Sequence, residues 1–269
     1  MSPPLAPPRV VLTIAGSDPS GGAGVQADIK TFAAHGVYGT SAITAITVQN
    51  TQGVQSAEPV GPSLVAAQIA AVAEDFSVAA AKTGMLATAG IVQAVAAEVT
   101  RFALPNLVVD PIVVSSSGAR LLDEAGVELL RASLLPLARV VTPNWSEAEA
   151  LTGVRVTSAA DARLAGVALL RMGVRAVIVT GGHGSGGDIV DVLVTADGVH
   201  ELRASRVAGR STHGTGCAFS ASLAAHLALD HPMADAIVLA QSFVADAIQH
   251  GFNLGSGPHG PMNHLPARS

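Results

Sequence analysis

The chain has 269 residues, of which 49% are hydrophobic and 13% are charged, and its formal net charge at pH 7 is -5. This composition supplies enough apolar side chains for one large core, and the acidic balance argues against a nucleic-acid partner held by a basic face. The longest Ala/Val-rich tract, residues 64–99, is interrupted by Glu74, Asp75 and Lys82, so it falls short of the roughly 20 apolar residues that a membrane span needs.

The first residues and the single cysteine bear on domain organisation and location. Residues 1–8 contain four prolines and are predicted to form a flexible segment ahead of a single domain over residues 9–269. No basic stretch precedes an apolar run there, so we expect no signal peptide. Cys217 is the only cysteine, which rules out an internal disulfide and suits a reducing compartment. We therefore expect a soluble cytoplasmic protein.

Short β-branched runs alternate with longer Ala-rich runs over the rest of the chain. Continuous apolar strands alternating with helices are typical of an α/β fold, with a mainly parallel central sheet, helices on both faces and an antiparallel edge hairpin. In chain order we predict a strand at 9–16, a helix at 24–36, a strand at 40–50, a helix at 61–76, a strand at 77–84, a helix at 88–102, a strand at 106–111, a helix at 123–132, a strand at 138–144, helices at 146–151 and 159–172, a strand at 175–182, a hairpin at 188–204, and helices at 215–229 and 233–250.

Five of these strands run directly into polar loops. The segments are IAGSDPSGG, AAKTGM, VVDPIV, VVTPNWSE and VIVTGGHGSGG. Ligands of an open parallel sheet bind beyond the carboxyl ends of the strands, which all lie at one edge. The sequence therefore predicts one site built from all five loops.

The segment THGTGC places Gly214, Thr215, Gly216 and Cys217 at the start of a predicted helix. The glycines allow a tight turn, and the unpaired N–H groups of a helix N-terminus form a ready anion site. A transferring phosphoryl group is the natural occupant. The positive helix end also predicts a lowered pKa for the thiol. The alternative is an ordinary glycine-rich loop with a structural cysteine.

The segment GSDPSGGAGVQAD resembles a dinucleotide-binding fingerprint only superficially. Its glycines begin several residues beyond the strand, and no acidic residue follows about 20 positions later to bind a ribose. Asp28 lies at the edge of the apolar stripe of the next helix, where a carboxylate needs a partner. That partner is either a ligand or a neighbouring group of the protein.

Oxygen ligands follow two other strands. Asp110 ends the strand in VVDP, and Asn144 and Glu147 are spaced i, i+3 in TPNWSE. Carboxylate and amide oxygens at strand ends suit Mg²⁺, which keeps several waters and bridges phosphates. Asn144 and Glu147 also fit a helix capping box, and the two interpretations are compatible.

The glycine-rich segment TGGHGSGG, with Thr180 and Gly182, follows a strand and is expected to meet nucleotide phosphates. We expect His183 in this segment, and likewise His213, to be structural rather than catalytic. No group of cysteines and histidines has the spacing of a zinc site.

Taken together, these motifs and the segment ITAITVQNTQGV resemble the hydroxymethylpyrimidine/phosphomethylpyrimidine kinases of thiamine biosynthesis, within the ribokinase-like superfamily. The resemblance covers residues 9–265, with the motifs in family order. It implies ATP- and Mg²⁺-dependent phosphorylation of 4-amino-5-hydroxymethyl-2-methylpyrimidine and then of its monophosphate. It also implies a homodimer.

The resemblance further implies roles for individual residues. Asp28 and Gln49 would bind the aminopyrimidine ring, in a pocket lined by Gly16, Met85 and Ile112. The GTGC loop would form the anion hole, with Cys217 placed where the acceptor hydroxyl is deprotonated or oriented. Asn144 and Glu147 would serve the Mg-nucleotide, with Asp110 as the second metal ligand and Thr180 and Gly182 near the phosphates.

Two departures from the family pattern concern positive charge. Thr180 stands where relatives commonly carry lysine, and Ser116 lies within a segment where they commonly read AKSG. Arg210 is the better candidate for a compensating cation, and Arg120 is another. Two alternatives stay open at this point: a pyridoxal kinase, and a pyrimidine- or nucleotide-binding protein that has lost catalysis.

Overall fold

The computed structural model describes residues 6–114, 120–182, 188–207 and 209–265. The first five residues of the expected flexible segment, the Ser116 departure and His183 lie outside these described residues.

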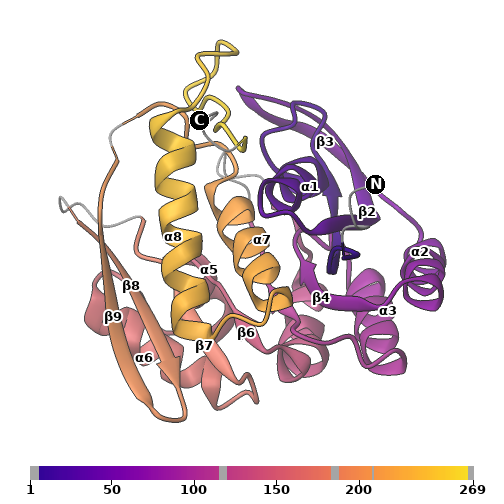
Figure 1. Cartoon of the computed structure of the whole chain (residues 1–269). Coiled ribbons are helices and arrows are strands. Elements are labelled where there is room, and N and C mark those ends of the chain that lie inside the picture. Colours follow the sequence, from indigo (N-terminus) through magenta and orange to yellow (C-terminus); the bar gives the residue numbers. More distant parts are fainter. Residues whose placement is uncertain (1–5, 115–119, 183–187, 208, 266–269) are drawn as a thin grey trace.

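The described residues form a nine-stranded sheet in the order β3-β2-β1-β4-β5-β6-β7-β8-β9. The pairs from β2 through β1, β4, β5 and β6 to β7 are all parallel, which confirms the mainly parallel sheet (Figure 1). The bounds of these six strands are Val10–Ser17 (β1), Tyr38–Asn50 (β2), Val78–Thr83 (β4), Val108–Val109 (β5), Val140–Val141 (β6) and Ala176–Val179 (β7).

Antiparallel strands close the sheet at both edges. The predicted hairpin is confirmed as β8 (Asp188–Thr195) and β9 (Gly198–Ser205), which pair beside β7. At the other edge β3 (Gly53–Pro59) pairs with β2, and this strand is absent from the predicted elements. Its sequence GVQSAEP is mostly exposed and holds few apolar residues, so it carries little strand signal of its own. The backbone pairing with β2 makes it a strand.

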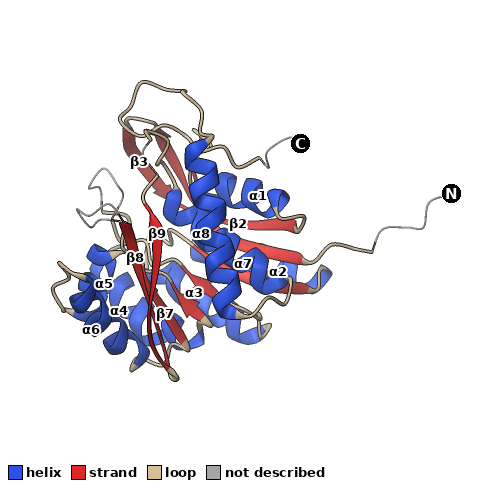
Figure 2. Ribbon diagram, turned by 60° about the vertical axis from the view of Figure 1, so that its left-hand side comes forward, coloured by secondary structure: helices blue, strands red, loops and turns tan. Residues whose placement is uncertain are grey.

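Helices cover both faces of the sheet (Figure 2). Alternate residues of a strand explain the two layers: Val108 and Val140 pack with the helices of one face, and Val109 and Val141 pack with those of the other. Both faces are therefore apolar, which is why the strands read as continuous hydrophobic runs. One layer consists of α1 (Gly24–Ala34), α7 (Thr215–Ala228) and α8 (Met233–Gln249), and the other of α2 (Pro62–Asp75), α3 (Ala89–Arg101), α4 (Glu124–Leu129), α5 (Trp145–Thr152) and α6 (Ala159–Leu170).

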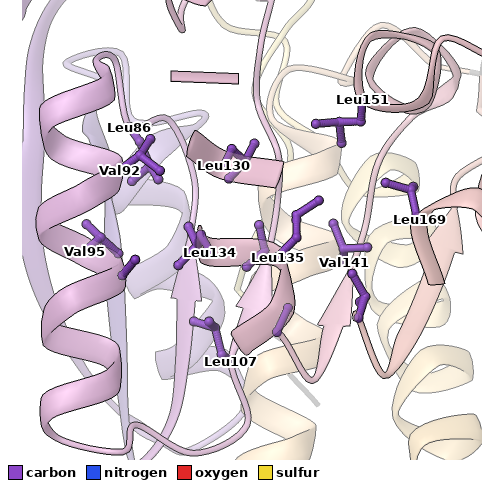
Figure 3. Packing of buried hydrophobic residues seen from close by; sticks show 14 of the residues in the cluster. Leu86, Val92, Val95, Leu107, Leu130, Leu134, Leu135, Val141, Leu151 and Leu169 are labelled. Atoms are coloured by element: carbon purple, nitrogen blue, oxygen red, sulfur yellow. The ribbon is translucent and has the colours of Figure 1, made fainter. Parts of the chain in front are cut away.

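The core beneath the second layer is built around a helix of mixed type. The helix expected at 123–132 is an α-helix only to Leu129 and continues as a π-turn over Leu130–Leu134 and a 3-10 turn over Leu135–Leu137. Pro136 has no N–H to continue an α-helix. Figure 3 shows Leu130 and Leu134 facing the side chains of α3. The tighter and wider turns thus bring successive leucines into one core.

Within the described part of the chain, the helices are too short or too polar to cross a membrane.

Candidate functional site

The five predicted loops meet at one edge of the sheet. Strands β1, β4, β5, β6 and β7 are neighbours and run parallel, so their carboxyl ends lie side by side. The start of α7 reaches the same edge, since the Ser220 hydroxyl of α7 donates to Asp110 Oδ2 after β5 at 3.0 Å. The expectation that these loops converge is confirmed.

A buried ion pair lies at the centre of this edge. Lys82 Nζ on β4 is 3.0 Å from Oδ1 and 2.9 Å from Oδ2 of Asp28 on α1, and the Thr13 hydroxyl donates to the same Oδ2 at 2.6 Å. Both charged side chains are wholly inaccessible to solvent. Burial alone would lower the pKa of Lys82, but Asp28, Cys217 and Asp110 together raise it. The lysine therefore stays charged.

These contacts bear on the two interpretations of Asp28. The partner that its position requires is a group of the protein, Lys82, with Thr13 as a second donor. Burial raises the pKa of the Asp28 carboxyl, while Lys82 and Thr13 act in the opposite direction. A direct contact of Asp28 with a pyrimidine stays a prediction, and the structure gives Asp28 a role in holding Lys82.

Cys217 lies in the first turn of α7, buried beside this ion pair. Burial raises the pKa of its thiol to about 12; Lys82 opposes this shift, and Asp110 and Asp28 add to it. The backbone N–H of Gly24 also hydrogen-bonds to the sulfur. The expected lowering of the thiol pKa is therefore wrong, because desolvation, together with the charges of Asp110 and Asp28, outweighs Lys82 and the Gly24 N–H. At neutral pH the group is a thiol.

Glycines let the loop before α7 pack directly against the loop before α1. Gly214 has φ +80°, and a Cβ on it would lie 1.9 Å from the carbonyl oxygen of Gly22. Gly24, with φ +59°, is equally constrained, since its Cβ would lie 2.3 Å from the oxygen of Gly16. A Cβ on Gly216 would meet nothing within 4 Å. The start of α7 is thus held by backbone contact, with open space over Gly216 for an anion.

A hydrogen-bonded network that sequence reasoning missed orders the loop after β1. Asp18 Oδ2 lies 2.9 Å from His213 Nε2 and accepts the backbone N–H of Ala23 at 2.8 Å. Burial alone would raise the pKa of Asp18, but hydrogen bonds from His213, Ser20 and Ala23 lower it. Asp18 therefore fixes the loop, and a structural role for His213 stays a prediction with which these contacts are compatible. The aspartate in SDPSGG, a turn-forming sequence, was the available signal.

The expected ring-binding residues fall into separate groups. Gln49 Nε2 lies 3.4 Å from His213 Nε2, so Gln49 belongs to the Asp18 network and not to the Asp28 ion pair. Met85 Sδ lies 3.2 Å from the position that a Gly16 Cβ would occupy, which brings those two residues together. Ile112 and Asp110 line one pocket with Gly84. The structure thus brings the apolar lining residues to the same edge.

Asp110 and Glu147 form a pair of buried carboxyl groups. The capping box is confirmed: Asn144 N–H donates to Glu147 Oε2 at 2.9 Å, and Glu147 N–H donates to Asn144 Oδ1 at 3.0 Å. Burial raises the pKa of Asp110, and burial and the Asp110 charge raise that of Glu147.

This pair fits the expected magnesium. Two buried carboxyl groups, of which Asp110 disfavours the charge of Glu147, offer oxygen ligands that suit a hard divalent cation. Within the described residues, no three His, Cys, Asp or Glu side chains are grouped to hold a metal ion. A magnesium ion held here would therefore complete its shell with water and phosphate oxygens.

The expected nucleotide residues divide between two places. Thr180 pairs with Asn144, its N–H donating to the Pro143 carbonyl at 2.9 Å, and Gly182 follows in the same loop. Arg210 instead donates from three guanidinium nitrogens to the segment from Asn253 to Gly257. Its predicted compensation for the missing lysine is therefore without support in these contacts. Arg120 likewise pairs with Glu124 and the Leu122 carbonyl.

Comparison with known proteins places these features in context. The family model described as phosphomethylpyrimidine kinase matches residues 18–263. The hydroxymethylpyrimidine/phosphomethylpyrimidine kinase of Haemophilus influenzae is 46% identical over 260 residues, covering 95% of this chain and 96% of that protein. The thiamine biosynthesis bifunctional protein ThiED of Geobacter sulfurreducens is 44% identical over 96% of this chain, which spans 52% of that protein's length.

Among solved structures, an ADP complex of Bacillus subtilis pyridoxal kinase matches with a TM-score of 0.88 at 36% identity. The match covers 96% of this chain and 97% of that one. The fold is thus the ribokinase-like fold expected from the sequence motifs.

The buried ion pair makes a prediction about stability. Replacing Lys82→Met leaves Asp28 buried without its partner, and breaking such a pair costs about 3–5 kcal/mol of unfolding free energy. The double variant Lys82→Met/Asp28→Asn removes both charges and should recover part of this loss. Urea denaturation of the wild-type protein, the single variant and the double variant measures both changes in unfolding free energy. Arg101→Gln, which breaks the exposed pair with Glu74, is the control and should cost no more than about 1 kcal/mol. An equal loss of unfolding free energy in Lys82→Met and Arg101→Gln would contradict the prediction.

The raised pKa of Cys217 makes a second prediction. At pH 8 native protein should react with iodoacetamide more than about a hundredfold more slowly than urea-unfolded protein, because the thiolate is the nucleophile. The native rate should keep rising with pH up to 10, whereas the unfolded rate levels off near the ordinary cysteine pKa. Mass spectrometry follows the modification. A native rate that levels off below pH 9 would show that the thiol is not shifted.

Proposed function

Because the chain belongs to the phosphomethylpyrimidine kinase family, we propose that it transfers the γ-phosphoryl group of ATP to 4-amino-5-hydroxymethyl-2-methylpyrimidine. The resulting monophosphate is then phosphorylated to the diphosphate, as the double name of the Haemophilus relative indicates for that protein. Both products serve thiamine biosynthesis.

One observation carries the proposal. The N-terminus of α7, with open space over Gly216, is tied by Ser220 to Asp110, and Asp110 acts electrostatically on Glu147. A phosphate-binding helix end and two carboxyl groups for a metal ion thus meet at one edge of the sheet. Phosphoryl transfer needs this combination, because its catalysis rests on positioning and on stabilising charge.

The acceptor side of the reaction uses Cys217 and the amides around it. The hydroxyl oxygen bonds to the γ-phosphorus as the bond to the bridging oxygen of ADP breaks, and the hydroxyl proton passes to solvent. The amides of Gly214 to Cys217 stabilise the charge on the transferring group. With a pKa of about 12, Cys217 orients the hydroxyl as a neutral thiol and is not the base. Lys82, beside Cys217, keeps positive charge near the reacting oxygens.

The substrate ring is assigned to the region beyond the carboxyl ends of β1 and β4. Gly16 and Met85 lie together there, with Ile112 nearby. Gln49, oriented by His213, supplies an amide that can pair with ring nitrogens and amino groups. Asp28 contributes by holding Lys82 in place. Direct contact of the Asp28 carboxylate with the ring is a further proposal.

The nucleotide side uses the loops after β5, β6 and β7. Asp110 and Glu147 would hold Mg²⁺, which when bound neutralises charge on the phosphate oxygens. Asn144 fixes Glu147 through the capping box, and Thr180 and Gly182 place backbone groups along the phosphates. Thr180 offers a hydroxyl in place of the lysine common among relatives, so charge compensation here depends more on the metal ion.

Pyridoxal kinase activity is the second candidate. The observation in its favour is the match to the Bacillus subtilis pyridoxal kinase over nearly the whole of both chains. Pyridoxal, like the pyrimidine, is a small aromatic ring that carries a hydroxymethyl group. Turnover of the two alcohols in competition separates the candidates.

We also propose that the protein is a cytoplasmic homodimer. The exposed face of β2 supports the dimer, because Ile46 and Val48 alternate along the strand on one face and are each more than half exposed. A single cysteine, without a second to pair with, suits a reducing cytoplasm.

The proposed reaction predicts two successive products. Protein incubated with Mg-ATP and the hydroxymethylpyrimidine should form monophosphate and then diphosphate, followed by mass spectrometry. Cys217→Ala should lower turnover by about tenfold or more through lost orientation of the hydroxyl, with ADP affinity unchanged by calorimetry. An unchanged rate would remove the thiol from the mechanism. No product from the pyrimidine, with turnover of pyridoxal, would favour the second candidate.

The dimer predicts a mass of two chains by light scattering after size exclusion. The double variant Ile46→Lys/Val48→Lys places two charges on the β2 face. It should have the mass of one chain, because a charge is costly to bury in an interface. Leu64→Lys on α2 is the control, since Leu64 is 58% exposed and lies off this strand face. A monomeric wild-type protein at micromolar concentration would overturn the proposal.

A further inference from the structure

A second concave site lies at the opposite edge of the sheet from the loops described above. Asn106, Leu107, Leu137, Arg139 and Arg175 are among the residues that line a groove of about 480 Å³. Leu107, Arg139 and Arg175 immediately precede β5, β6 and β7. The groove therefore sits at the amino ends of the strands whose carboxyl ends carry the proposed nucleotide residues.

The charges in this groove are of one sign. Two arginines line it and none of its lining residues is acidic. The Arg139 guanidinium donates to the side-chain oxygen of Asn106, a neutral partner. Asn106 is itself held, since its Nδ2 donates to the Ala79 carbonyl at 2.8 Å. Arg139 is thus fixed in place while its positive charge stays uncompensated.

Arg175 is the second uncompensated cation. Its side chain is exposed, and among the described residues it has no hydrogen bond or ion pair. Several other arginines of this acidic chain are paired with carboxylates, as in Arg9–Asp230, Arg101–Glu74 and Arg163–Glu201. Two arginines that share a groove without an acidic neighbour create a local positive potential in a protein of net charge -5.

The rest of the groove mixes apolar and polar surface. Leu137 is 37% exposed at its lining, and Val99, Leu104 and Leu107 are buried beneath it, between the end of α3 and the starts of the strands. Its volume lies within the range of about 300–1,000 Å³ that is typical of small-molecule sites. Guanidinium groups match the geometry of phosphate and carboxylate oxygens, often with two hydrogen bonds each.

We propose that this groove binds a small organic anion, a phosphate or carboxylate carried on an apolar body. Arg139 and Arg175 bind the anionic group, and the exposed Leu137 contacts the apolar part. The site is separate from the proposed kinase site and does not depend on the proposed reaction.

Calorimetry with two probes tests the proposal on the whole protein. Phenyl phosphate and benzoate are titrated in the presence of saturating Mg-ADP, so that the nucleotide site is occupied. At least one probe should bind. Arg175→Gln and Arg139→Gln should each lower the affinity for that probe about tenfold, which corresponds to about 1.4 kcal/mol. Which probe binds more tightly distinguishes a phosphate from a carboxylate ligand. Inorganic phosphate should bind more weakly than phenyl phosphate, because it lacks the apolar part.

Arg155→Gln is the matched control, since Arg155 is exposed and does not line the groove. It should leave the affinity within twofold. Arg175 has no partner to lose, so its variant decides the test even if Arg139→Gln perturbs folding through Asn106. Absence of binding by both probes at 10 mM (roughly -2.7 kcal/mol), or equal binding by Arg175→Gln and wild type, would overturn the proposal. Equal affinity for inorganic and phenyl phosphate would overturn its apolar part.

Discussion

Two opposite charges, Asp28 on α1 and Lys82 on β4, meet where water has no access, and the centre of the site is organised around them. Taking both from water is costly, so the pair persists only with close geometry and with further polar partners. Thr13 supplies one partner, while Asp110 and Cys217 lie within electrostatic range. The pair therefore links a helix, three strands and the start of α7 through one set of charges. Burial raises the pKa of the neighbouring Cys217 thiol; Lys82 acts against this shift, and Asp110 and Asp28 add to it, so the sulfur keeps its proton.

The parallel sheet places the remaining chemistry. Each strand alternates its side chains between two apolar cores, so most polar groups of the site lie where the strands end, and Lys82 and Thr13 are buried exceptions within strands. At those ends the backbone itself completes the arrangement. The backbones of Gly22 and Gly214 pack together without side chains between them. The Asp18 carboxylate accepts hydrogen bonds from three backbone N–H groups of its loop. The carboxyl edge is thus polar and closely packed, whereas the amino edge keeps the groove lined by two arginines.

Local patterns predicted most of the fold and part of the site. Apolar periodicity located eight helices and the parallel strands, and the spacing of Asn144 and Glu147 predicted a capping box that the structure contains. Strand β3 was missed because its residues become a strand only by pairing with β2. Lys82 was noted only as a charge that interrupts an apolar tract, although a lysine within AAAKTG was itself a signal of a buried partner. The thiol pKa was predicted in the wrong direction, since burial and the charges of distant residues are not visible in a local motif.

The contact between Gly214 and Gly22 has a consequence for the order in which the protein is made. A ribosome releases the loops after β1, β4, β5, β6 and β7 in turn, long before residues 214–217 emerge. Until then Cys217 and Ser220 are missing from beside Lys82 and Asp110. A nascent chain therefore contains nearly every residue of the site before the site can form. Biosynthesis itself delays the assembly of this centre until α7 docks on the face of the sheet formed by β1, β4 and β5.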